Sequence, residues 1–244
     1  QCYADSLPML LISAEPDSRT IGKGWGVLHE VTEQKKLTEP ITALSATAYR
    51  PSDVPDLLAQ AFTIFSSQRP RPVHISIPLD VQSKIVEEDW LPVVLPERPT
   101  AKVSEVNRAV DLLRKAQNPL VMIGGGAQEA SKELIQIAEN IGAIVVCSTA
   151  GKGIVPDEHP LSVSASTVRP EVQNLLPKAD VIMAVGTEIS ETDSFVERLN
   201  ISGEIIRIDI DSKKLSDYYP AKVGLVADAK SACSAILEVL GPAK

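Results

Sequence analysis

Two short apolar runs, each bounded by residues that end a strand, most constrain the fold of this 244-residue chain. The first run, Val73–Ile77, lies between two prolines. Proline has no backbone N–H, so it can start or end a strand but cannot lie within a central one. The second run, Pro119–Ile123, leads directly into three glycines and then into a helix-type pattern. The first run is therefore interpreted as the end of one α/β unit, and the second as the start of another.

The region before residue 83 predicts a strand at 9–13, a glycine-rich loop, a helix, and the strand at 73–77. Ser52 is the candidate N-cap of the helix. Apolar residues then recur at intervals of three and four and give the helix one apolar face: Leu57, Leu58, Ala61, Phe62 and Phe65. A buried parallel strand needs neighbours on both sides. Because no element precedes the strand at 9–13, we expect residues 1–82 to be an incomplete unit.

Residues 103–244 alternate strands with helices, which predicts an α/β fold of parallel sheets covered by helices on both faces. We expect a six-stranded sheet with strands at 120–123, 144–147, 161–164, 181–185, 205–210 and 223–226. Between the two units, residues 83–102 are acidic and contain spaced prolines, as in an extended linker.

The composition excludes several classes of function. A formal net charge of -8 argues against nonspecific nucleic-acid binding, which needs a basic surface. No apolar run approaches the ~18 residues of a membrane span, and no signal-type segment opens the chain. The three cysteines and three histidines are widely separated and match no metal motif. We therefore expect a reduced, cytoplasmic protein that binds neither nucleic acid nor membrane.

Gly124, Gly125 and Gly126 lie where a predicted strand turns into a predicted helix. Glycine lets the backbone approach a phosphate closely, and a helix N-terminus offers free N–H groups to an anion. A tight turn without any ligand is the alternative, because the run is not G-x-G-x-x-G. Glu129, in the first helical turn, would also compete with a bound anion.

Four further candidate nucleotide-binding residues lie at the carboxyl ends of later predicted strands: Thr149, Gly186, Asp209 and Asp211. In doubly wound sheets, ligands bind just beyond the carboxyl ends of the strands, where an acidic side chain can accept hydrogen bonds from a ribose. Polar loops and turn-capping carboxylates are the alternative, and the residues alone do not decide between the two.

Several blocks of this sequence, in this order, resemble thiamine-diphosphate-dependent enzymes of the acetolactate synthase and 2-oxo-acid decarboxylase group. The blocks are Tyr3–Ser13, Gly26–Glu30, Pro40–Thr42, Pro72–Asp80, Asn118–Ala127, Thr149–Gly153, Val185–Glu188 and Arg207–Asp211. The resemblance covers nearly the whole chain. It implies that residues 1–82 are the C-terminal half of a pyrimidine-binding domain and that 103–244 are a Rossmann-like central domain.

The resemblance implies a lyase or transferase that acts on a 2-oxo acid with thiamine diphosphate and Mg²⁺. The family's catalytic glutamate lies in the first half of the pyrimidine domain, and a third domain holds the metal through a Gly-Asp-Gly motif and an Asn. No residue here matches either feature, so we assign no catalytic and no metal-binding residue. We expect a fragment that is inactive alone and binds neither cofactor. The resemblance also implies a homodimer or homotetramer. Two alternatives to an enzyme fragment are a stand-alone nucleotide-binding module and a non-catalytic scaffold.

The central domain of acetolactate synthases binds FAD, and Gly124–Gly126 and Thr149 match FAD-contacting positions. Two other segments depart from the family's pattern. Leu161–Ser166 lacks the expected Met-Gly motif, and Gly186–Asp193 lacks the arginines of the Gly-x-Arg-Phe-Asp-Asp-Arg block. These departures predict that FAD does not bind, and they favour a 2-oxo-acid decarboxylase over a true acetolactate synthase.

Overall fold

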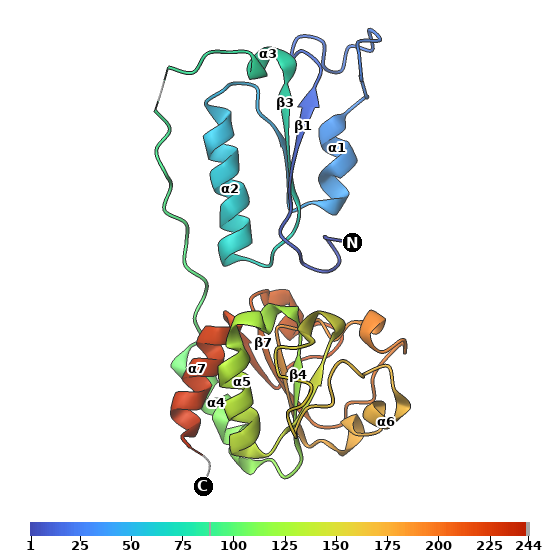
Figure 1. The fold of residues 1–244 in the computed structure, drawn as a ribbon, viewed down its shortest axis with the longest axis vertical. Helices are drawn as coiled ribbons and strands as arrows, with labels where there is room; N and C mark the ends of the chain where they lie inside the picture. The colour runs from blue at the N-terminus through green and yellow to red at the C-terminus, as the bar shows by residue number, and fades with distance from the viewer. Residues whose placement is uncertain (88, 243–244) are drawn as a thin grey trace. The chain divides into compact units, whose positions relative to one another are not determined.

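A computed structural model describes residues 1–87 and 89–242 of the chain (Figure 1). It divides into two compact units, Gln1–Arg98 and Pro99–Lys244. Each unit is built on a parallel sheet with helices, which confirms the predicted α/β fold class. Between helices α3 (Leu79–Gln82) and α4 (Val103–Lys115), the described residues form neither helix nor strand.

The first unit holds a three-stranded parallel sheet in the order β1-β3-β2. Its strands are β1 (Leu10–Glu15), β2 (Leu44–Thr47) and β3 (Val73–Pro78). Its longer helices are α1 (Gln34–Thr38) and α2 (Asp53–Ser67). Strand β2 and helix α1 were not predicted, because β2 (Leu-Ser-Ala-Thr) contains no Val or Ile and α1 (Gln-Lys-Lys-Leu-Thr) has a single apolar residue. Helix α2 begins where predicted, but the Ser52 hydroxyl makes no capping bond; the Asp53 carboxylate instead accepts from the N–H groups of Tyr49 and Arg50.

The two faces of the first sheet differ in character. Toward α2, the buried residues Ala61, Val73 and Ile75 form a small apolar core with partly buried neighbours from α2 and all three strands. The alternate positions of β3 place His74 and Ser76 on the other face, and both are buried. Edge strand β1 leaves Leu11 42% and Ile12 56% exposed, so apolar side chains of this strand lie uncovered.

The second unit holds a five-stranded parallel sheet in the order β5-β4-β6-β7-β8. The strands are β4 (Pro119–Ile123), β5 (Ile144–Cys147), β6 (Val181–Val185), β7 (Glu204–Asp209) and β8 (Val223–Val226). The main helices are α4, α5 (Ser131–Ile141) and α7 (Ala229–Leu240), with a short α6 at Pro170–Gln173.

The predicted count of six strands is wrong. The segment 161–164 forms a single bridge, between Ser162 and Val145 of β5. Backbone bonds join Leu161, Val163 and Ser164 to β5, but Ser164 has a φ of 56°. A strand cannot continue through this left-handed conformation, so the pairing of the segment with β5 ends at Ser164.

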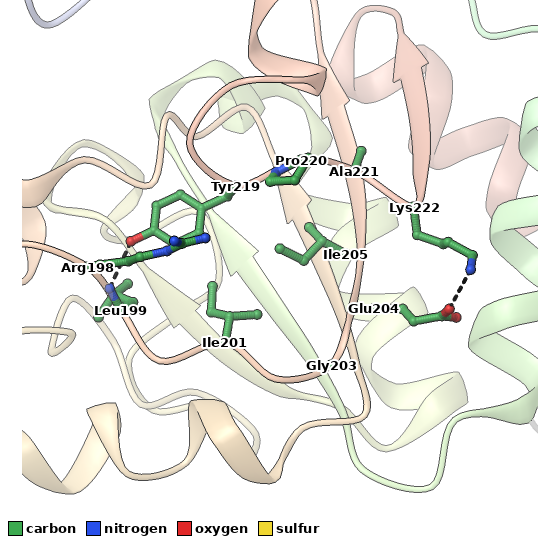
Figure 2. A pocket seen from close by; sticks show the side chains of 10 residues that line it. All are labelled: Arg198, Leu199, Ile201, Gly203, Glu204, Ile205, Tyr219, Pro220, Ala221 and Lys222. Atoms are coloured by element: carbon green, nitrogen blue, oxygen red, sulfur yellow. Dashed lines mark hydrogen bonds and ion pairs between the residues drawn. The ribbon is translucent and has the colours of Figure 1, made fainter.

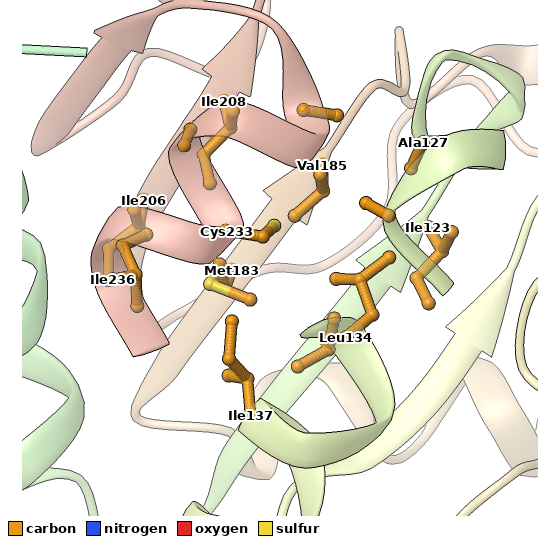
Figure 3. Close-up of a cluster of buried hydrophobic side chains, with 14 of the residues drawn as sticks. Ile123, Ala127, Leu134, Ile137, Met183, Val185, Ile206, Ile208, Cys233 and Ile236 are labelled. Atoms are coloured by element: carbon orange, nitrogen blue, oxygen red, sulfur yellow. The ribbon is translucent and has the colours of Figure 1, made fainter. Parts of the chain in front are cut away.

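Apolar cores cover both faces of the second sheet. On one face, α4, α5 and α7 pack against the strands, and Figure 3 shows Leu134, Ile137 and Ile236 meeting Met183 and Ile206. The other face carries a second buried cluster that includes Leu120, Ile182 and Leu176. Every residue of β4 and β6 is buried, as expected for central strands with two covered faces. Among the described residues, no helix is both long and apolar enough to cross a membrane.

Candidate functional site

The predicted nucleotide-binding residues lie at the carboxyl ends of parallel strands β4 to β7. We call this set the carboxyl-end loops: 124–126 after β4, 148–151 after β5, 186–193 after β6, and 209–211, which begin at the last residue of β7. Because these strands are neighbours and run in the same direction, their loops share one edge of the sheet, where ligands bind in open α/β sheets.

The glycines after β4 pack directly against the loop after β6. A Cβ atom added to Gly124 would lie 2.2 Å from the Gly186 carbonyl oxygen and 2.6 Å from the Thr187 Cα. The Gly124 N–H donates to the Val185 carbonyl at 2.9 Å, and the Gly126 N–H donates to the Gly186 carbonyl at 3.1 Å. Gly186 itself has a φ of 56°, which favours glycine. Contact between two loops therefore accounts for these glycines without a bound phosphate.

The segment after β4 also differs from the predicted strand-to-helix turn. Gly125–Ala130 form a 3₁₀ helix, and the α-helix begins only at Ser131. The N-terminus of α5, with its free N–H groups, is therefore six residues beyond Gly125 rather than at the glycines. An anion held by the glycines would not receive the first N–H groups of α5.

At the end of β5, an internal carboxylate accepts the hydrogen bond that a ligand anion would take. The Thr149 N–H donates to Asp193 Oδ1 at 3.0 Å, and the Gly151 N–H donates to the Ser148 hydroxyl at 3.1 Å. Asp193 lies 44 residues after Thr149, so sequence reasoning did not identify it as part of the site. The cavity beside Asp193, Ser148 and Thr187 is about 10 Å³, roughly room for one water molecule.

Asp209 and Asp211 bond to their own loop. Asp209 is 4% exposed, and its Oδ1 accepts from the Asp211 N–H at 2.9 Å. Asp211 Oδ1 accepts from the Lys213 N–H at 3.0 Å and caps the 3₁₀ turn Ser212–Leu215. Both carboxylates thus have the turn-capping contacts of the alternative interpretation, and binding of a ribose by them stays a prediction.

Arg207, which the sequence analysis did not single out, fixes the loop after β6. It is 1% exposed, although it lies within the apolar strand β7. Its Nη2 donates to the Thr187 carbonyl at 2.9 Å, and its Nη1 bonds to Asp217 Oδ1 at 2.7 Å and to the Tyr219 carbonyl at 3.2 Å. A buried charge needs such partners, so one charged residue inside an apolar run is a signal that could have revealed this network.

Glu188 adds a second anchor to the same loop. Its Oε2 lies 2.5 Å from Lys214 Nζ, and both side chains are about three-quarters buried. Together with Arg207, this ion pair ties residues 187–188 to the segment 214–219. The loop that packs on the glycines is therefore held at several points.

Two of the cysteines, Cys147 and Cys233, are buried. Burial raises the pKa of the Cys147 thiol to about 11, with a smaller contribution from Asp157, so the thiol stays protonated near neutral pH. Burial also raises the pKa of Cys233. Within the part of the chain that the structure describes, no group of three His, Cys, Asp or Glu residues could hold a metal ion.

The first unit contains a separate polar network on the face of its sheet away from α2. His74 is 1% exposed; its Nε2 lies 2.7 Å from the Ser13 hydroxyl, and its Nδ1 lies 2.7 Å from the Thr38 hydroxyl and 3.1 Å from that of Ser45. Burial lowers the pKa of His74, against a smaller opposing effect of Glu15. The imidazole therefore links hydroxyl groups of β1, α1 and β2.

Glu15 continues this network at the carboxyl end of β1. It is 6% exposed, and its Oε2 accepts from the Ser76 hydroxyl at 2.7 Å and from the Thr47 hydroxyl at 3.2 Å. One hydroxyl or carboxylate from each of the three strands thus meets at this point, and those of Glu15 and Ser76 are buried. Polar side chains thus connect the strands on this face of the first sheet, whereas apolar clusters cover both faces of the second sheet.

Comparison with known families identifies the second unit. Residues 106–236 match the family described as "Thiamine pyrophosphate enzyme, central domain". The chain belongs to the thiamine pyrophosphate enzyme family. The resemblance predicted from the sequence blocks is thereby confirmed.

Related proteins extend the match over both units. The chain is 44% identical over 239 residues to the Pseudomonas aeruginosa protein named Probable 2-ketoarginine decarboxylase AruI, covering 97% of this chain and 43% of that protein. It is 29% identical over 251 residues to the Probable acetolactate synthase large subunit of Methanocaldococcus jannaschii, covering 98% and 42%. The chain therefore spans less than half the length of these curated relatives.

A solved structure supports the fold. The crystal structure of benzoylformate decarboxylase from Polynucleobacter necessarius matches with a TM-score of 0.82 and 18% identity, covering 100% of this chain and 46% of that one. At this identity the likeness shows the fold alone.

Proposed function

We propose that this chain is part of a thiamine-diphosphate-dependent enzyme that decarboxylates a 2-oxo acid. The family match over residues 106–236 carries the proposal. The decarboxylase assignment is supported by the relatives, since identity is 44% to the protein named as a 2-ketoarginine decarboxylase and 29% to an acetolactate synthase. Carboligation of the acetolactate synthase type is the second candidate, because such proteins match both units as well.

The substrate that we propose is 2-ketoarginine, a 2-oxo acid with a cationic guanidinium group. The name of the 44% identical relative supports this choice, and the match covers 97% of the present chain. Related enzymes that differ in substrate usually differ in a few pocket contacts, so the choice of substrate needs a direct test.

Within such an enzyme, we assign the role of scaffold to the residues of this chain. Residues 1–82 would form the C-terminal half of the pyrimidine-binding domain and 103–244 the central domain. Thiamine diphosphate, when bound, supplies the ylid and the electron sink for decarboxylation. We assign no residue of this chain to catalysis or to Mg²⁺, so we expect the 244 residues alone to be inactive. We also expect the complete enzyme to be a homodimer or homotetramer.

We further propose that the carboxyl-end loops of the central domain do not bind FAD. Three observations support this: the Asp193 carboxylate already accepts from Thr149, the Gly124 and Gly126 N–H groups already have main-chain acceptors, and the adjoining cavity is about 10 Å³. A diphosphate here would have to displace a carboxylate and separate two packed loops. The residues present therefore do not fit the group.

The test uses the full-length protein that contains these 244 residues, supplied with thiamine diphosphate and Mg²⁺. Carbon dioxide release is measured with 2-ketoarginine and with pyruvate, and acetolactate is assayed in the pyruvate reaction. We expect kcat/KM for 2-ketoarginine to exceed that for pyruvate by about 100-fold or more. Acetolactate formation without turnover of 2-ketoarginine would favour the second candidate. Flavin absorbance in the purified protein would contradict the proposal on FAD alone.

A further inference from the structure

A cavity of about 390 Å³ lies at the opposite end of the second sheet from the carboxyl-end loops. Glu204, which lines it, is the first residue of β7, and Lys222, which also lines it, immediately precedes β8. The cavity therefore opens at the amino ends of these parallel strands (Figure 2). Its volume is in the range of small-molecule sites.

The floor of this cavity is apolar and fixed. Leu199, Ile205 and Tyr219 line it and are 5%, 7% and 5% exposed. The Tyr219 hydroxyl accepts from the Leu199 N–H at 2.8 Å, which holds the ring in place. In Figure 2, the side chains of Ile201 and Ile205 point into the space between this ring and Lys222. Such a surface favours an apolar body over a fully polar ligand.

One wall of the cavity carries a positioned cation. The Arg198 guanidinium lies 4.8 Å from the centre of the Tyr218 ring and 5.8 Å from that of Tyr219, and its Nη2 donates to the Tyr218 carbonyl at 3.3 Å. These contacts restrict its rotamers, so little side-chain entropy is lost when a ligand binds. Among the residues that the structure describes, no carboxylate lies within ion-pair distance of Arg198.

The opposite wall, formed by Lys222 and Glu204, carries no net charge. Lys222 Nζ lies 2.9 Å from Glu204 Oε1, so the ammonium is already paired. A second carboxylate on a ligand would therefore gain no net attraction at this end of the cavity. The charge pattern therefore favours a ligand with one carboxylate, oriented toward Arg198.

We propose that this cavity binds a small monocarboxylate with an apolar body, whose carboxylate pairs with the Arg198 guanidinium while its body lies against Tyr219 and Ile205. Guanidinium and carboxylate groups match in bidentate geometry, and such charge-assisted bonds are stronger than neutral ones. The site is separate from the carboxyl-end loops and from the reaction proposed above, so its test does not depend on either of them.

The test is ligand-detected NMR on the full 244-residue chain, with benzoate as the probe and benzamide as its neutral isostere. We expect benzoate to bind with a dissociation constant on the order of 1 mM or tighter, and benzamide to bind about tenfold more weakly or worse. Equal binding of the two probes, or no binding of benzoate at about 10 mM, would overturn the proposal.

Variants locate the site. Arg198→Gln should weaken benzoate binding about tenfold or more, whereas Arg108→Gln, the same change at an exposed position of α4, should leave it unchanged. Ala221→Phe should fill the cavity and abolish benzoate binding, while circular dichroism should show an unchanged fold. This second variant tests the site even where Arg198→Gln is misfolded. Unchanged binding in both cavity variants refutes the site. If wild type fails to bind benzoate and Arg198→Gln reduces self-association, the cavity is an interface between copies, which also refutes it.

Discussion

The two units are built on the same kind of sheet, but they cover its faces in different ways. In the second unit, helices and loops bury both faces, and all residues of β4 and β6 are buried. In the first unit, apolar packing covers only the face toward α2, and β1 leaves Leu11 and Ile12 exposed. A parallel sheet is stable when both faces are covered, so the comparison teaches that equal strand patterns need not give equal stability.

The remaining face of the first sheet depends on polar contacts. His74, Ser76 and Glu15 bond to hydroxyl groups of neighbouring strands and of α1. A typical hydrogen bond contributes about 0.5–1.5 kcal/mol to stability, compared with about 1.5–3 kcal/mol for burying a large apolar side chain. We therefore expect the first unit to be the less stable part of the isolated chain.

The largest expected difference is in backbone hydrogen exchange. In the isolated, monomeric chain, amides of β4 should be protected about 1,000-fold more than those of β1, because a difference of about 4 kcal/mol in opening free energy corresponds to that ratio. Exchange followed by mass spectrometry gives both values from one sample. Equal protection of residues 10–15 and 119–123 would show that the two units are equally stable and would contradict the expected difference.

Matched core deletions sharpen the same contrast. Leu134→Ala, at a fully buried position of the second unit, should cost about 3 kcal/mol of unfolding free energy, because it leaves a cavity in a closed core. Leu58→Ala, at a half-buried position of α2, should cost about 1–1.5 kcal/mol. Urea unfolding measures both: Trp25 and Trp90 report on the first unit by fluorescence, and circular dichroism reports on the whole chain. A larger loss for Leu58→Ala would reverse the expected order.

The polar face predicts a pH dependence that belongs to the first unit alone. Because burial lowers the pKa of His74 in the folded state below the ordinary value of 6.5, the unfolded state binds more protons in that window. The contribution is fully present above about pH 6.5 and is lost as pH falls through the folded pKa, with a slope of at most ~1.4 kcal/mol per pH unit. Tryptophan fluorescence in urea, from pH 8 to about pH 5, follows it.

His74→Gln removes the titrating group but keeps hydrogen-bonding atoms, so it should flatten this pH dependence. His29→Asn is the matched control, since His29 is exposed and has a φ of 59°, a conformation that Asn tolerates. An unchanged slope in His74→Gln, or an equal loss of slope in His29→Asn, would assign the effect to other groups.

The smallest expected effect concerns the internal carboxylate of the second unit. Asp193→Ala removes the acceptor of the Thr149 N–H and should cost about 0.5–2 kcal/mol, as for loss of a helix cap. Asp193→Asn retains an oxygen acceptor and should cost less. Inorganic phosphate, at matched ionic strength with chloride, should raise the melting temperature of Asp193→Ala more than that of wild type. An equal shift in both proteins would mean that no anion replaces the carboxylate.

Local patterns in the sequence determined most of the second unit. Apolar runs predicted five of its strands, because a parallel strand that is covered on both faces carries apolar side chains toward both of them. The pattern failed at 161–164, where the backbone conformation of Ser164 ends the pairing with β5. It also failed at β2, which contains no Val or Ile, and at α1, which has a single apolar residue.

The site itself was decided by tertiary structure. The sequence placed Gly124, Thr149 and Gly186 at strand ends, but their partners are set by contacts between distant segments: Gly186 packs on Gly124, and Asp193 accepts from Thr149 across 44 residues. The cavity at Arg198 likewise forms only when the residues before β7 meet those before β8. Periodicity reports which side chains face the core, whereas the partner of a polar group depends on which chain segments the sheet brings together, and no local pattern encodes that pairing.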